Sequence, residues 1–143
     1  MATEYEIYEK EVEKIIKENE VYLEKFAKWL EEKGLSPKTI RNHVGNVDFY
    51  INDFLCYYEP QNYIAGCHNI HGFLGDWFIR KALWSSQAYV KSTAASIKKF
   101  YSFMLEEGKV STEDYQELCE DIKELMPEWL ESMQRFDNLA YEE

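Results

Sequence analysis

The chain has 143 residues, of which 27 are acidic and 16 basic, so its formal charge is −11. This length suits one domain, and a hydrophobic content of 45% with 16% aromatic residues excludes a disordered chain. Six glycines and three prolines are too few for the many turns of a β-sandwich or barrel. The acidity argues against general nucleic-acid binding by the chain as a whole.

The sequence also indicates a compartment. No apolar run approaches the ~18 residues that a membrane span needs, and the N-terminal residues lack the basic and apolar regions of a secretory signal. The three cysteines are odd in number and irregularly spaced, which favours a reducing compartment over a disulfide framework. We therefore expect a cytoplasmic protein without a membrane partner.

The charge is unevenly distributed along the chain. Residues 1–32 carry a net charge of −5, residues 33–110 carry +3, and residues 111–143 carry −9. A protein surface presents local fields and not an average. A basic surface is therefore expected in the middle segment, although solvated outer faces of Glu-rich helices would give the same pattern.

The first helix is predicted from apolar residues that recur at three- and four-residue steps between Tyr5 and Leu30. Asn19 interrupts this stripe, so the segment is either one long helix or two shorter ones. Gly34 is expected to end it, because glycine adopts the left-handed conformation of a C-terminal cap.

Two further helices are predicted before residue 80. Ser36 and Pro37 are typical of a helix cap and a first helical residue, and the buried face of that helix extends to about Tyr58. A third, shorter helix is expected between Ile70 and Phe78, where apolar residues follow helical spacing.

The last two helices complete the predicted fold. The fourth begins at Ser85 or Ser86 and ends at Gly108. Ser111 opens the fifth, which Pro127 is expected to kink or restart. Because no segment alternates with a period of two, we predict an all-α fold: a compact single-domain bundle of five to six helices.

The order of motifs in the middle of the chain is informative. The run from Phe26 to Val44 places Gly-Leu-Ser-Pro-Lys-Thr between an aromatic-rich helix and a helix that carries a basic residue. Later, the run Ile97-Lys-Lys-Phe-Tyr-Ser-Phe-Met-Leu-Glu-Glu-Gly108 places aromatic residues before a glycine. In this order the motifs resemble the core-binding domain of tyrosine recombinases (phage integrases), over roughly residues 21–110.

The resemblance implies a SAM-like helical domain that contacts the backbone of duplex DNA. Residues 1–20 would then be an acidic helical extension, and residues 111–143 an acidic C-terminal helix. Carried over by position, the candidate DNA contacts are Lys38, Thr39, Arg41 and Asn42 on the second helix, and Ser86, Lys91, Lys98 and Lys99 on the fourth. Such contacts mostly position a protein on DNA and carry little sequence information.

The chain departs from that family in its chemistry. In tyrosine recombinases a separate C-terminal domain supplies a nucleophilic tyrosine held among Arg, Lys and His residues. Here the chain has no segment for such a domain, and none of its three histidines is followed by an arginine three residues later. We therefore expect no enzymatic activity, no catalytic residues and no cofactor.

Two alternatives accompany this interpretation. The run Cys67-His-Asn-Ile-His71 contains metal-ligand types, but a full site needs more ligands than it provides, and a polar helical turn is the favoured interpretation. For the whole chain, the alternative function is an acidic helical module for protein–protein interaction. If residues 111–143 compete with DNA for the lysines of the fourth helix, deleting them should raise DNA affinity at low salt.

Overall fold

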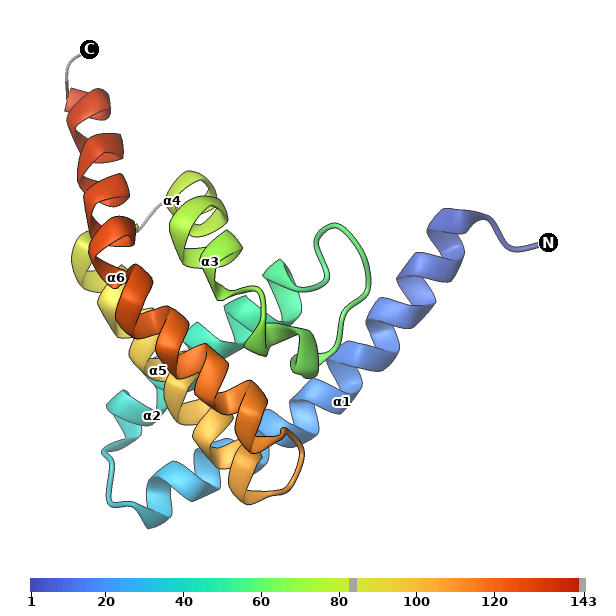
Figure 1. The fold of residues 1–143 in the computed structure, drawn as a ribbon. Coiled ribbons are helices and arrows are strands. Elements are labelled where there is room, and N and C mark those ends of the chain that lie inside the picture. The colour runs from blue at the N-terminus through green and yellow to red at the C-terminus, as the bar shows by residue number, and fades with distance from the viewer. Residues whose placement is uncertain (83–84, 142–143) are drawn as a thin grey trace. The chain divides into compact units, whose positions relative to one another are not determined.

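The computed structural model describes residues 1–82 and 85–141, which are helical with short connections and contain no strand (Figure 1). The predicted all-α class is therefore confirmed. The chain folds into two compact units, Met1–Gly66 and Cys67–Glu143. Their boundary lies inside the segment 21–110 that sequence motifs treat as one region.

The first unit is built on α1 (Glu4–Glu32). Thr3 caps it by accepting a hydrogen bond from the main-chain nitrogen of Glu6 at 3.1 Å, which satisfies one of the free donors of the first turn. Asn19 does not divide the helix. Its buried amide donates to Oδ1 of Asn52 at 2.7 Å, so the polar residue in the apolar stripe has its own partner.

A tight turn leads from α1 to α2 (Pro37–Asp48). Gly34 has a φ of +87°, as expected for a left-handed cap, and Ser36 caps α2 through the main-chain nitrogen of Thr39. A π-helical segment, η1 (Phe49–Phe54), continues α2. The two helices and η1 pack against one another, and the apolar residues buried in this unit include Leu23, Phe26, Leu30, Val47, Tyr50, Ile51 and Leu55.

The second unit begins with three short helical elements in succession. They are α3 (Ile70–Gly72), the π-helical η3 (Phe73–Trp77) and α4 (Phe78–Lys81). Together they occupy the position of the single helix expected from the spacing of apolar residues. The residues of that spacing, Ile70, Phe73, Leu74, Trp77 and Phe78, are all buried.

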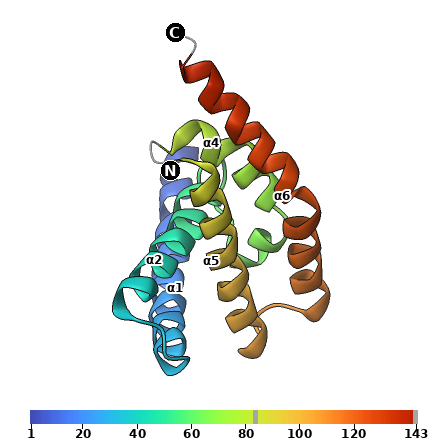
Figure 2. The same cartoon turned by 90° about the vertical axis from the view of Figure 1, so that its left-hand side faces the viewer.

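Two long helices, α5 (Gln87–Glu106) and α6 (Thr112–Tyr141), lie side by side in the second unit, as both views show (Figures 1 and 2). Gly108 has a φ of +72° in the connection between them. Pro127 lies inside α6, which is not restarted there but changes direction part-way along in both views. Leu118, Trp129 and Met133 are buried, so α6 is part of the core of this unit.

Candidate nucleic-acid interface

Helix α5 presents a basic outer face. Val90, Ala94, Ile97 and other residues at helical spacing are buried, which turns the opposite side of the helix to solvent. On that side Lys91, Lys98 and Lys99 are exposed, together with the small residue Ala95. The three lysines carried over by position to the fourth helix are therefore exposed on α5.

The three lysines of α5 have no bound opposite charge among the residues that the structure describes. None of them forms an ion pair within residues 1–82 and 85–141. Lys91 and Lys98 are seven residues apart, which places them ~10 Å apart along the helix axis. Three ammonium groups spread in this way are able to meet separate phosphates of one duplex.

Ser86 has a structural role at the start of α5. Its hydroxyl oxygen accepts a hydrogen bond from the main-chain nitrogen of Tyr89 at 3.1 Å and so caps the helix. The residue is only partly exposed, and its hydroxyl oxygen is engaged in the cap. Ser86 therefore fixes where α5 begins and is a weaker candidate contact than the lysines.

The other predicted contacts lie at the start of α2 in the first unit. Lys38, Thr39, Arg41 and Asn42 are all exposed. Thr39 is engaged locally, because its hydroxyl accepts a hydrogen bond from the Ser36 hydroxyl at 3.0 Å. Four of the eight predicted residues thus share α2 and four belong to α5 or its cap, each set within its own unit.

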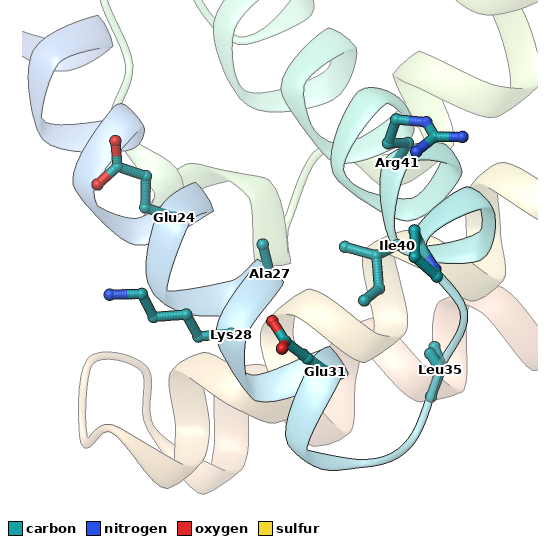
Figure 3. Close-up of a pocket in the computed structure, with 8 residues that line it drawn as sticks. Glu24, Ala27, Lys28, Glu31, Leu35, Ile40 and Arg41 are labelled. Carbon is teal, nitrogen blue, oxygen red and sulfur yellow. The ribbon is translucent and has the colours of Figure 1, made fainter.

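Arg41 lines a groove of about 660 Å³ between the second half of α1 and the start of α2 (Figure 3). The apolar lining comes from Ala27, Leu35, Pro37 and Ile40, and the charged lining from Glu24, Lys28, Glu31 and Arg41. Two carboxylates from α1 therefore share the groove with its two cations. This balance weakens the positive field at Arg41, so α5 is the more strongly basic surface.

Acidic side chains cover the outer side of α6. Glu113, Glu117, Glu120, Glu124 and Glu128 are exposed. The pKa of Asp121 is raised, first by partial burial and then by the neighbouring charges of Glu117 and Glu124. Because α5 and α6 pack together, the second unit carries a basic and an acidic surface on adjacent helices.

His68 joins the start of the second unit to α6. Its Nδ1 is hydrogen-bonded to Oε2 of Glu117, and its Nε2 lies 3.2 Å from Oδ1 of Asp114. The hydrogen bond to Glu117 and the charges of both carboxylates raise the pKa of His68, against an opposing effect of desolvation. His68 thus lies between two carboxylates that stabilise its protonated form.

Two other residues of the run Cys67–His71 are also engaged in the fold, Cys67 by burial and His71 by a hydrogen bond. Burial raises the pKa of Cys67 to about 12, which keeps it a thiol. Nδ1 of His71 accepts a hydrogen bond from the indole nitrogen of buried Trp129 at 2.8 Å. No group of three or more metal-ligating side chains is found in the part of the chain that the structure describes.

Trp129 and His71 are 58 residues apart in the sequence, and no local pattern indicates that they meet. Their contact is supported by Gly75, because a Cβ atom there would lie 2.9 Å from Nδ1 of His71 and 3.0 Å from Cδ1 of Trp129. A glycine inside a helical apolar pattern is a signal for such a close approach. The glycine does not indicate which side chain lies against its Cα atom.

Comparison with known proteins adds no family assignment. No family model, no curated protein and no solved structure matches this chain. Among the described residues, no helix has both the length and the apolar character needed to cross a membrane.

Proposed function

We propose that this chain is a non-catalytic module that binds the backbone of duplex DNA through the basic face of α5. The observation that carries the proposal is the set of three exposed lysines, Lys91, Lys98 and Lys99, none of them in an ion pair among the described residues. Lys38, Arg41 and Asn42 on α2 are a separate set of candidate contacts within the first unit. The resemblance of residues 21–110 to the core-binding domain of tyrosine recombinases supports the same function.

The contacts in this proposal are with phosphate groups. Lysine ammonium groups bind phosphate oxygens mainly by charge, so they carry little sequence information. Each phosphate neutralised releases counterions, and the binding constant then falls steeply as salt rises. With a chain charge of −11, we expect weak binding that is detectable at low salt only.

The test is a titration of a labelled random duplex at several salt concentrations, read by fluorescence anisotropy. The variant K91Q/K98Q/K99Q removes the basic face of α5. The control K10Q/K14Q/K17Q removes the same charge from exposed positions of α1. We expect the α5 variant to lose affinity and to lower the salt slope by about 0.9 per lysine, while the control binds like the wild type.

Equal affinities of the two variants would contradict the proposal, because the lysines of α5 would then act only through net charge. Absence of binding by the wild-type chain at low salt would also contradict it. That second result favours the alternative function, an acidic helical module for protein–protein interaction. The observation in favour of that alternative is the exposed carboxylate surface of α6, which repels phosphates and attracts basic protein surfaces.

A further inference from the structure

Four tyrosines come together in the first unit at the start of α1 and in the segment after η1. The hydroxyl of Tyr8 donates to the main-chain oxygen of Cys56 and lies 3.5 Å from the main-chain oxygen of Tyr57. These contacts join the two segments. Tyr5, Tyr57 and Tyr58 are exposed to 67%, 48% and 72%. We call Tyr5, Tyr8, Tyr57 and Tyr58 the tyrosine patch.

The rings of the patch present their faces in different directions. Tyr5 stacks on Tyr8 with centroids 6.2 Å apart and an angle of 29°. Tyr57 and Tyr58 meet at 4.8 Å and 81°, so their two rings form a corner. Single exposed apolar residues are ordinary on a protein surface. Exposed aromatic residues that gather into one patch are instead typical of a binding surface.

The charge around the tyrosine patch is negative. Residues 1–9 and 55–62 contribute Glu4, Glu6, Glu9 and Glu59, all exposed, and no lysine or arginine. The hydrogen bond to Glu9 raises the pKa of the Tyr5 hydroxyl. Glu6 and Lys10 each lie two residues from Tyr8 along α1 and therefore ~200° around the helix from it, on the other side, which leaves Glu4, Glu9 and Glu59 beside the patch. The patch thus combines aromatic faces with carboxylates.

We propose that the tyrosine patch binds an arginine-rich segment of a partner protein. Aromatic faces attract cations, and the contact is stronger for a guanidinium, which stacks on a ring while its N–H groups bond to carboxylates. A phosphate ligand would be repelled by Glu4, Glu9 and Glu59. A purely apolar partner would leave those carboxylates desolvated and unpaired.

The chain already contains one contact of this chemical type. Nζ of Lys33 lies 5.1 Å from the ring centroid of Trp29, within the range of a cation–π interaction. The tyrosine patch offers ring faces of the same kind to a cation from outside. This inference does not depend on DNA binding by α5.

The test measures binding of labelled poly-arginine and poly-lysine peptides of equal length to the full chain by fluorescence anisotropy. The variant Tyr5→Ser with Tyr58→Ser removes two exposed rings. The control Tyr89→Ser with Val21→Ser removes two other exposed apolar side chains, which lie outside the tyrosine patch. Circular dichroism verifies that both variants keep their helix content.

We expect the wild-type chain to bind poly-arginine more tightly than poly-lysine. The tyrosine variant should lose roughly tenfold in affinity for poly-arginine, together with its preference for arginine. The control should retain both. Equal binding by the tyrosine variant and the control would overturn the proposal, because attraction would then be a general property of an acidic chain.

A second pair of variants tests the carboxylates. Glu4→Gln with Glu9→Gln removes two charges beside the patch, and Glu120→Gln with Glu124→Gln removes two from α6. A larger loss of poly-arginine affinity from the first pair supports the assignment to the patch. An equal loss from both pairs overturns it. Because no DNA is present, failure here is distinct from failure of the proposed function.

Discussion

Helices α5 and α6 both bury an apolar inner side, but their exposed outer sides carry charges of opposite sign. Each buries an apolar stripe at helical spacing in the second unit. The exposed side of α5 carries Lys91, Lys98 and Lys99, whereas that of α6 carries glutamates. Inward residues are fixed by packing, while outward charge is free to vary without altering the fold. The formal charge of −11 averages over both surfaces and describes neither.

The acidic C-terminal segment is part of the core of the second unit and not a removable extension. On sequence alone it is an extension that could be deleted to expose the lysines. In the structure, Leu118, Trp129 and Met133 of α6 are buried, and Nε2 of Gln87 donates to the main-chain oxygen of Leu130 at 2.8 Å. Deletion of residues 111–143 would therefore remove part of the core, and substitution of individual residues is the proper test.

The largest effect is expected for Trp129→Ala. This substitution empties a buried site of an indole ring and removes the donor to His71, so the free energy of unfolding should fall by about 3–5 kcal/mol. Urea denaturation followed by circular dichroism measures the loss. The control Glu128→Ala changes an exposed neighbour and should stay within about 0.5 kcal/mol. Similar losses in the free energy of unfolding for Trp129→Ala and Glu128→Ala would show that α6 is not part of the core.

The connection between the two helices is tested by Gly108→Ala. Gly108 has a φ of +72°, and nothing lies within 4 Å of a Cβ built there. The cost is therefore conformational, and we expect a loss of roughly 1–2 kcal/mol in the free energy of unfolding. Gly45→Ala is the matched control, since Gly45 lies within α2 and also has open space around it. It should stabilise the chain by about 0.5–1 kcal/mol.

Neutralising exposed glutamates of α6 tests the effect of its charge on DNA binding without altering its buried residues. The variant E120Q/E124Q/E128Q removes three exposed carboxylates and leaves the buried stripe intact. If α5 binds DNA, the repulsion between α6 and phosphates should decrease, and affinity at low salt should rise a few-fold. Anisotropy at two salt concentrations measures it. Removal of three exposed glutamates from α1, E11Q/E13Q/E20Q, is the control, and an equal rise there would refute a local effect of α6.

The smallest effect is expected from the pH dependence of His68. Contacts with Glu117 and Asp114 raise its pKa in the folded chain, so its protonated form is stabilising. This contribution is complete below the unfolded value of ~6.5 and is lost as pH rises through the higher folded value. At 44% side-chain exposure, solvent screening keeps it small. Urea denaturation at several pH values between the unfolded and folded pKa of His68 measures the free energy of unfolding. This free energy should depend less on pH in His68→Gln than in the wild type, and an equal dependence in both would contradict the prediction.

Local signals in the sequence were sufficient for the starts of α2, α5 and α6 and for the ends of α1 and α5. Ser36, Ser86 and Ser111 each accept a hydrogen bond from a main-chain nitrogen three residues later, and Gly34 and Gly108 have the positive φ that a cap requires. These features depend only on neighbours within one turn, so the residue types determine them directly. The basic stripe of α5 was predictable for the same reason, because helical periodicity assigns each side chain to a face.

Contacts between distant segments were not predictable in this way. Tyr8 reaches Cys56, Asn19 reaches Asn52, and His68 reaches α6 across 49 residues to Glu117. Helical periodicity says that a residue faces inward or outward, but it does not say which partner it meets. The boundary at Gly66 and the tyrosine patch depend on such pairings.

The sequence by itself determined the helical class, the caps and the face on which each charge lies, because these follow from propensity and a period of 3.6 residues. Only the tertiary structure decided that α6 belongs to a core, that His68 and His71 have partners in the fold, and that four tyrosines gather beside glutamates. These outcomes depend on which surfaces pack together, and packing is chosen by the free energy of the whole chain and not of any one turn.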